Sequence, residues 1–286
     1  MLERDGYPPG VPCWIDTAQQ DPEAAVAFYG GVFGWDFVER TPEGSPGEYH
    51  AAQIEGRDVG AVGSQMSETP YPPVWQTYVW VESADDAVAQ VTAACGNVLA
   101  EPFDIFDAGR MAALSDPSGA SFCVWQAGKH KGAQVVNHPG SWNWSDLYTR
   151  DPEGAKSFYG AVFGWQTETL DLGGFEATMW RMPGYGDFLE TIEPGLRARQ
   201  EGAGAPTGFA DAIGWLMPMS SDQFPDDAPA HWNVTFAVDD TDAVAGRAAN
   251  LGGEILQQPY DVGDARVAVV RDPQGATFTV SKYDPS

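Results

Sequence analysis

The chain has 286 residues, of which 43% are hydrophobic and 12% aromatic, enough to form the cores of two domains of ordinary size. Its formal net charge of −26 disfavours binding to nucleic acid or to anionic membrane surfaces, since both require basic patches. No apolar run approaches the ~20 residues that span a membrane, and the first residues lack a secretory pattern. The three cysteines have no metal-type spacing. We therefore expect a cytoplasmic protein with free thiols.

The first predicted elements are a short strand over residues 12–18 and a helix that begins after Asp21. Asp21 is a good N-cap, and Pro22 occupies the first helical position, where its missing N–H costs nothing. Apolar residues then recur at helical spacing as far as Phe33, and Gly34 is suited to end the helix with a positive φ. The Phe-Tyr-Gly-x-Val-Phe-Gly-Trp motif here is therefore predicted to be structural.

The next predicted elements are a strand over residues 77–81, a helix over 84–94, and a hairpin. Residues 110–115 and 120–126 read as the two strands of this hairpin. Asp116-Pro117-Ser118-Gly119 lies between them and fits a type I turn, with Asp first, Pro second and Gly fourth.

The second half of the chain repeats the first. Residues 151–165 match residues 21–35 without a gap, 130 positions later. Residues 232–259 and 266–280 match 75–102 and 110–124 at offsets of 157 and 156, so the second copy carries an insertion. We predict two domains, residues 1–127 and 141–286, joined by a linker over 128–140, with the insertion near 184–227.

Together these motifs resemble the vicinal oxygen chelate superfamily, which includes glyoxalases, bleomycin resistance proteins and extradiol dioxygenases. The resemblance covers nearly the whole chain twice and is closest to the fused two-domain, actinobacterial glyoxalase-like or hydroxylase-like group, some of whose members belong to aromatic polyketide pathways. It implies an α+β fold of tandem glyoxalase-like domains. Each domain would combine two βαβββ units into a cupped sheet of about eight strands with two helices.

The metal-ligand positions that the resemblance implies hold residues of the wrong chemistry. Counting from the helix-opening and turn aspartates transfers these positions to Trp14, Gln76 and Cys123 in the first domain, and to Trp144, Asn233 and Thr279 in the second. Trp offers no lone pair to a metal, and Asn and Thr are poor ligands for Zn²⁺, Ni²⁺ or Fe²⁺. The Cys–Gln pair of the first domain alone supplies too few ligands. The four histidines show no metal-binding spacing. We therefore expect no metal and no cofactor, and assign these six residues to ligand contact instead.

Trp14 and Asp16 are two residues apart on one predicted strand, so both face the same side of the sheet. Trp144 and Asp146 repeat this pair. Each cup would hold an indole for stacking beside a carboxylate that binds a cation or hydroxyl, or that transfers protons. The alternative is a core Trp with a structural Asp. The same periodicity predicts that Trp142 shares a face with Trp144, and we expect Trp180 to contact the ligand and the insertion to cover the second cup.

Two classes of function remain open. One is a metal-free protein that binds a planar aromatic natural product, either neutral or cationic, in a Trp-lined cup. The other is a glyoxalase-like or hydroxylase-like enzyme of aromatic polyketide metabolism, a lyase, isomerase or oxygenase-associated protein. Such an enzyme would use Asp16 and Asp146 for proton transfer, or an atypical metal site. In either class we expect a small-molecule partner, no nucleic acid or membrane partner, and a monomer or homodimer.

Overall fold

The computed structural model describes residues 3–41, 44, 46–66, 71–171, 176–222 and 224–284. Apart from α4, α5 and η1 in the second half, helices and strands follow one another in the same order in each half of the chain. Among the helices in this part of the chain, none is both long and apolar enough to cross a membrane.

The first half forms one eight-stranded mixed sheet in the order β2-β3-β4-β1-β5-β8-β7-β6. Each of its two βαβββ units supplies four neighbouring strands, as the resemblance implies. The elements are β1 (Pro12–Gln19), α1 (Pro22–Phe33), β2 (Asp36–Glu39), β3 (Tyr49–Ile54), β4 (Arg57–Ser64), β5 (Trp75–Trp80), α2 (Ala84–Ala93), β6 (Asn97–Ile105), β7 (Gly109–Ser115) and β8 (Ser121–Ala127).

The second half forms a second sheet with the equivalent order, β10-β11-β12-β9-β13-β16-β15-β14. The tandem α+β architecture is thereby confirmed. The elements are β9 (Trp142–Thr149), α3 (Pro152–Phe163), β10 (Gln166–Asp171), β11 (Glu176–Arg181), α4 (Tyr185–Ile192), α5 (Leu196–Gly202), η1 (Phe209–Asp211), β12 (Ala212–Pro218), β13 (His231–Ala237), α6 (Thr241–Asn250), β14 (Glu254–Val262), β15 (Ala265–Arg271) and β16 (Thr277–Tyr283).

The repeated helices begin and end where the sequence predicts. The Asp21 side chain accepts a hydrogen bond from the backbone N–H of Ala24 at 2.9 Å, with Pro22 in the first turn. Gly34 ends α1 in the left-handed region, with φ of 73°. Helix α3 repeats both features with Asp151 and with Gly164, whose φ is 74°. Local chemistry alone therefore fixes these helix ends.

The additional residues of the second copy lie between two strands of its sheet. In the first domain β3 and β4 are joined by a short turn, whereas in the second the equivalent strands β11 and β12 are separated by α4, α5 and η1. The predicted insertion range, 184–227, therefore also contains β12, which belongs to the sheet because it pairs with both β11 and β9.

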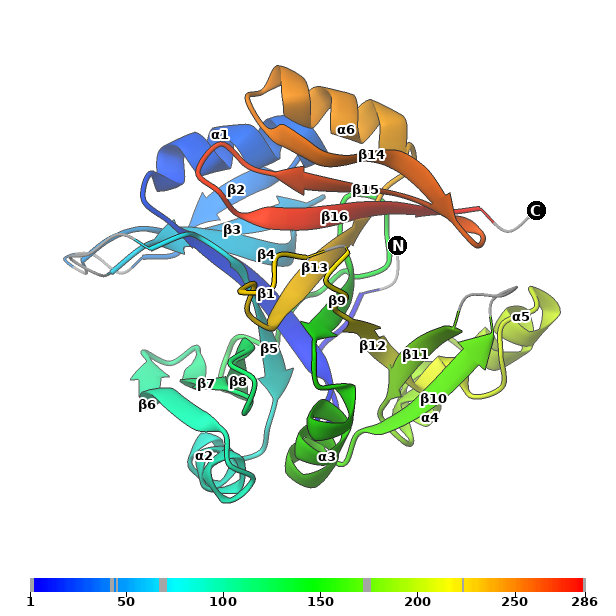
Figure 1. Cartoon of the computed structure of the whole chain (residues 1–286). Coiled ribbons are helices and arrows are strands. Elements are labelled where there is room, and N and C mark those ends of the chain that lie inside the picture. The colour runs from blue at the N-terminus through cyan, green and yellow to red at the C-terminus, as the bar shows by residue number, and fades with distance from the viewer. Residues whose placement is uncertain are drawn as a thin grey trace.

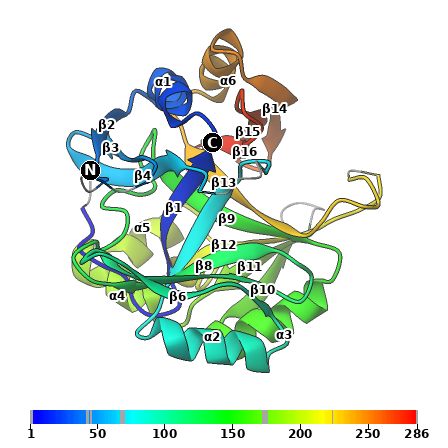
Figure 2. The same ribbon diagram turned by 90° about the vertical axis from the view of Figure 1, so that its left-hand side faces the viewer.

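The two sheets lie back to back at their central strands, with one pair of helices at the top of the molecule and one pair at the bottom (Figure 1). Strand β13 contacts β5 across the middle, α1 packs beside α6, and α2 packs beside α3. Figure 2, turned by 90°, shows the same two helix pairs at opposite ends of the molecule. The concave faces of the sheets therefore point away from each other.

Two hydrogen-bonded chains cross between the domains. Trp75 Nε1 donates to the Tyr29 hydroxyl at 3.0 Å, and that hydroxyl donates to Asp272 Oδ2 of the other domain at 2.8 Å. All three residues are buried. Asp272 opens the second Asp-Pro-x-Gly turn, so the chain ties helix α1 and strand β5 to the hairpin of the opposite domain.

Because the sequence repeats, an equivalent series of hydrogen bonds runs from the second domain to the first. Trp232 Nε1 donates to the Tyr159 hydroxyl at 3.0 Å, which donates to Asp116 Oδ2 at 3.3 Å. The Trp residues that end the repeated motif also cross, because Trp35 donates to the Gly140 carbonyl and Trp165 to the Gly10 carbonyl, each at 2.6 Å. The repeated motif is therefore structural, as predicted, and its role is to join the domains.

We predict that Tyr159→Phe lowers the free energy of unfolding by about 1–3 kcal/mol, because it leaves the buried Trp232 N–H without its acceptor and removes a donor from Asp116. Tyr29→Phe should have an effect of the same order. Chemical denaturation measures both. Tyr283→Phe is the matched control, since Tyr283 is 62% exposed and its loss should change stability little. Wild-type stability in both core variants would contradict the proposed role of the crossing chains.

Candidate functional site

The concave face of the first sheet, here the first cup, is lined by side chains that alternate along its central strands. Asp16 on β1 lies directly opposite Gln76 on β5, Trp14 lies opposite Tyr78, and Tyr78 lies beside Cys123 on β8. Residues paired in this way share one face of a sheet. The predicted residues of the first domain therefore do come together.

The first cup is filled by its own side chains. The Asp16 carboxylate accepts hydrogen bonds from Tyr49 at 3.0 Å and from Tyr78 at 2.9 Å, both at Oδ2. The Tyr49 hydroxyl also accepts from Trp14 Nε1 at 3.0 Å. Trp14 is only 4% exposed, and the edge of the His130 ring packs against it at a centroid distance of 4.4 Å. The indole and carboxylate of this cup are thus used within the protein.

The electrostatics of the first cup reflect that network. Burial raises the pKa of Asp16 to about 6, although hydrogen bonds from Tyr78 and Tyr49 favour the charged form and limit the rise. Burial also raises the pKa of the Cys123 thiol, with the nearby Asp16 charge adding to the effect. Cys123 is therefore a thiol and not a thiolate at neutral pH, which makes it a poor metal ligand or nucleophile.

The second cup is the equivalent face of the second sheet, and its central residues are Trp144 and Asp146 on β9, Asn233 and Thr235 on β13, and Thr279 on β16. Asn233 pairs with Asp146, and Thr235 pairs with both Trp144 and Thr279. The Asn233 amide donates to Thr279 Oγ1 at 3.0 Å, and Thr235 Oγ1 donates to Asp146 Oδ2 at 3.0 Å. The structure thus also brings together the predicted residues of the second domain, apart from Trp142 and Trp180.

Asp146 is less well satisfied than Asp16. It is 8% exposed, and its Oδ1 atom is buried without a hydrogen-bond partner. Burial raises the pKa of Asp146 to about 7, while the Thr235 hydroxyl and the nearby Trp215 backbone N–H favour the charged form. Buried polar atoms are nearly always hydrogen-bonded, and this oxygen is one of five buried side-chain atoms without a partner among the described residues, so it can accept from a ligand or water.

The difference between the cups comes from two substitutions in the repeat. The strand pairing places Arg181 where the first sheet has Gln53, and hence Ala177 where it has Tyr49. Thr235 stands in the position of Tyr78. Alanine cannot donate a hydrogen bond, and threonine supplies only one short donor. The second cup therefore lacks the pair of phenols that fills the first.

Aromatic rings border the second cup. Trp144 is half-buried, and its ring meets the edges of Phe209 at 6.1 Å and Trp215 at 6.2 Å. Phe209 comes from the insertion, as expected for a cover, whereas Trp215 is a residue of strand β12. Tyr260, 42% exposed on β14, lies on the same face at the opposite side of the sheet. A flat ligand entering the cup would meet aromatic surface on both sides.

Two sequence-based expectations about this cup are wrong. Trp142 does not share a face with Trp144, because a bulge at Asn143 pairs Trp144 with Thr235 but Trp142 with Phe236, which faces the core between the domains. Trp180 is fully buried on the back of the sheet, against Tyr159 and Trp165. Neither can line the cup.

The expected cover is also only partly as predicted. Tyr185 and Phe188 of α4 stack on each other at 6.2 Å, and Tyr185 accepts a hydrogen bond from Arg4 of the N-terminal segment. Tyr185 is buried in the hydrophobic core and does not lie over Trp144.

The residues present do not fit the metal that the fold family implies. In the part of the chain that the structure describes, His, Cys, Asp and Glu side chains form no group of three or more that could hold a metal ion. At the implied positions, Trp14 donates to Tyr49, Gln76 donates to Ser121 at 3.4 Å, and Asn233 donates to Thr279. These polar groups make hydrogen bonds to protein partners, so no chemical step through a metal follows from them.

Sequence reasoning missed Tyr49, Tyr78 and Thr235 as members of the cups. Tyr78 and Thr235 lie two residues beyond the chosen Gln76 and Asn233, so strand alternation would have found them. Tyr49 has no such local signal, because it reaches Asp16 from a strand on the other side of β4.

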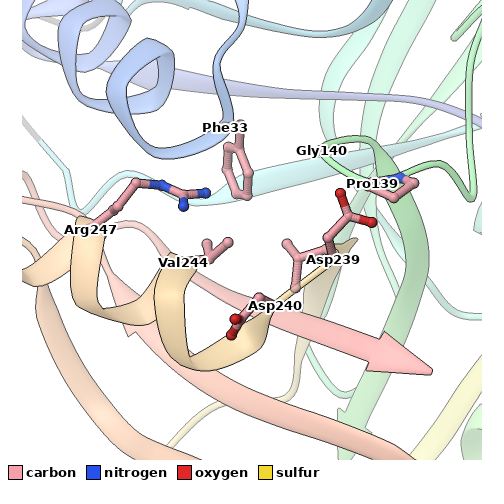
Figure 3. A pocket seen from close by; sticks show the side chains of 8 residues that line it. Phe33, Pro139, Gly140, Asp239, Asp240, Val244 and Arg247 are labelled. Carbon is pink, nitrogen blue, oxygen red and sulfur yellow. The ribbon is translucent and has the colours of Figure 1, made fainter. Parts of the chain in front are cut away.

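A cavity of about 200 Å³ lies at the seam between the domains, at the start of α6 and the end of α1 (Figure 3). Two of the charged residues that line it, Asp240 and Arg247, have structural roles. Asp240 caps α6 by accepting from the Ala243 N–H, and the Arg247 guanidinium donates to the Val32 carbonyl at 3.0 and 3.2 Å, at the C-terminal end of α1. We therefore do not regard it as the functional site.

The fold and cups have clear relatives. Residues 14–124 match the model of the glyoxalase/bleomycin resistance protein/dioxygenase superfamily, and residues 147–281 match that of the glyoxalase-like domain. The chain belongs to this superfamily. A putative glyoxylase, CFP32 of Mycobacterium tuberculosis, is 35% identical over all of this chain and 99% of its own. The anthracycline biosynthesis protein DnrV of Streptomyces peucetius is 33% identical over 96% of this chain and 94% of its own.

Solved structures support the fold alone. The Mn(II)-bound glyoxalase of Novosphingobium aromaticivorans superposes with a TM-score of 0.59 at 16% identity, covering all of this chain and 85% of that one. The 2,3-dioxygenase LapB of Pseudomonas sp. KL28 also gives a TM-score of 0.59, at 12% identity, over 96% of this chain and 93% of its own.

We predict that Asp146→Asn makes the protein more stable than wild type at neutral pH but not at pH 4. A raised folded-state pKa favours folding below pH 3.8, and this contribution is lost as pH rises to about 7. The difference between variant and wild type should therefore grow from pH 4 to 7 and level off near pH 8, reaching at most about 4 kcal/mol. Denaturant unfolding across this pH range measures it. Asp227→Asn, at an exposed carboxylate, is the control. If the stability difference between Asp146→Asn and wild type depends on pH as little as it does for this control, the raised pKa of Asp146 is contradicted.

Proposed function

We propose that the protein binds a planar aromatic small molecule in the second cup, without a metal. The observation that carries this proposal is the contrast between the two cups. In the first cup both tyrosines donate to Asp16 Oδ2 and Tyr49 accepts from Trp14, whereas Asp146 keeps a buried unpartnered oxygen beside the half-buried Trp144. A protein that needed both cups only for packing would have no reason to leave this one incomplete.

The chemistry of the second cup suits such a ligand. Indole and phenol rings bind flat apolar molecules through stacking and edge contacts. A carboxylate that is partly shielded from water binds a hydroxyl or cationic group more strongly, since electrostatic interactions strengthen where water is excluded. The name of the relative DnrV points the same way, because anthracyclines have a flat polycyclic ring system.

An enzymatic role at the same site is the second candidate, and the raised pKa of Asp146 favours it. A carboxyl group with a pKa of about 7 is matched to proton transfer at neutral pH. The protein would then act as a glyoxalase-like or hydroxylase-like enzyme, with Asp146 moving a proton on the bound aromatic substrate. The superfamily fold accommodates both roles, so the choice depends on the site.

Replacing Trp144 should distinguish the second cup from the first. We expect Trp144→Ala to weaken the binding of flat tricyclic compounds such as 9-fluorenone by about 1–3 kcal/mol, the range for a lost buried aromatic contact. Calorimetric or fluorescence titration measures this. Trp144→Phe and Trp14→Phe form the matched pair, and only the first should reduce affinity. Equal affinities for wild type and Trp144→Ala would refute binding at this cup.

Asp146→Asn separates the two candidate functions. If the protein only binds its ligand, affinity should fall modestly and mainly for cationic or hydroxylated compounds. If Asp146 transfers a proton, binding should be nearly unchanged while turnover falls about 10²–10⁴-fold. The measurement is a paired titration and product assay, with flat aromatic hydroxyketones as trial substrates.

A further inference from the structure

The floor of the second cup presents one open hydrogen-bond acceptor. Of the two Asp146 oxygens, Oδ2 accepts from Thr235 at 3.0 Å, and Oδ1 is the buried atom without a partner. A carboxylate oxygen can only accept while it is charged. Above the pKa of Asp146, which is about 7, a ligand that completes this site must therefore bring a donor.

The same floor presents one open donor. Thr279 Oγ1 accepts the hydrogen bond from the Asn233 amide at 3.0 Å, so its own hydroxyl proton must point elsewhere. Thr279 is half-buried on the concave face. A ligand carbonyl that reaches this hydroxyl can accept its proton.

The sheet register places the acceptor and the donor on one face of the second sheet. Asp146 on β9 lies directly opposite Asn233 on β13, and Thr279 on β16 lies opposite Thr235, two residues further along β13. The Asn233 side chain reaches Thr279 across that offset. The backbones of β9 and β16 are about 10 Å apart, which is two strand spacings, so a ligand that contacts both groups must bridge the strand between them.

We propose that the second cup selects, among flat aromatic compounds, those that carry a hydroxyl and a carbonyl on the same edge of the ring system. The hydroxyl donates to Asp146 Oδ1, and the carbonyl accepts from the Thr279 hydroxyl. This inference rests on the proposed function and names its ligand class. It replaces chelation of two ligand oxygens by a metal with two hydrogen bonds of opposite direction.

A hydroxyl fits this floor better than an ammonium group. An ammonium carries three donors, and burying it is costly unless each finds an acceptor. The described part of the cup floor offers a single unpartnered carboxylate oxygen. A hydroxyl has one donor, which this oxygen satisfies.

Entry of the ligand requires one side chain of the cup to move. Oδ1 of Asp146 is closed off from solvent, so a covering group must turn aside before a hydroxyl reaches it. Trp144 is suited to do so, because its described ring contacts are two edge contacts, to Phe209 and Trp215. Its counterpart Trp14 is fixed by a hydrogen bond to Tyr49. Ligand binding should therefore change the Trp144 side-chain signal in NMR spectra.

Isomers of hydroxy-9-fluorenone test the proposal with constant size and hydrophobicity. In the 2-hydroxy isomer the hydroxyl lies on the carbonyl edge, and in the 4-hydroxy isomer it lies on the opposite edge. At pH 8 we expect the 2-hydroxy isomer to bind at least about tenfold more tightly than the 4-hydroxy isomer and 9-fluorenone, since it adds a hydrogen bond to a charged group.

Two variants assign the two hydrogen bonds. Asp146→Asn should remove the preference for the 2-hydroxy isomer, while Thr279→Val should weaken all three fluorenones by about 3- to 10-fold and keep the preference. Asp16→Asn, the matched change in the first cup, should leave every affinity unchanged. Circular dichroism and unfolding midpoints establish that the variants are folded.

The outcomes separate this inference from the proposed function. Equal binding of all three compounds, weakened by Trp144→Phe, would overturn the hydroxyl–carbonyl selection and leave aromatic binding in place. A preference that survives Asp146→Asn would also overturn it. If the wild-type protein binds none of the fluorenones at millimolar concentration, both proposals fail.

Discussion

The hydroxyl of the repeated tyrosine is the point on which the rest of the structure depends. Tyr29 and Tyr159 each receive a buried indole N–H from their own domain and donate to the turn aspartate of the other domain. Because the polypeptide repeats its sequence, the two series of hydrogen bonds are related as in a symmetric dimer, where each contact occurs twice. One motif therefore joins the helix and sheet of each domain to the hairpin of the other. The convex faces of both sheets are thereby used up in the interface between the domains.

The two concave faces take no part in this interface, so their side chains can differ between the domains. In the first, the hydroxyls of Tyr49 and Tyr78 converge on Oδ2 of Asp16. In the second, Ala177 and Thr235 stand in their places, and Asp146 is left with a raised pKa and an open oxygen. A buried carboxylate of this kind costs stability, and proteins keep such costs where they serve a function. For this reason our proposal assigns ligand binding to the second domain.

The proposed function would use a metal-binding scaffold for other chemistry. At the implied ligand positions, Trp14, Gln76 and Asn233 donate hydrogen bonds to neighbouring protein groups. What remains of the site is its geometry: side chains from three central strands that converge on one point of a curved sheet. In our proposal, that geometry serves hydrogen bonding to two ligand oxygens.

The sequence by itself determined everything that depends on local chemistry or on the repeat. Asp21 and Gly34, like their counterparts in the second copy, mark the two ends of a helix. Asp-Pro-x-Gly closes a hairpin. The alternation of side chains along a strand puts Asp16 on the same face as Trp14. The same alternation failed for Trp142, because a one-residue bulge moves every earlier side chain to the other face. Only the tertiary structure decided which Trp residues are core, which domain each tyrosine bonds to, and which aspartate is left open. Those outcomes depend on donors carried by distant strands, and spacing along the chain does not encode which strands become neighbours.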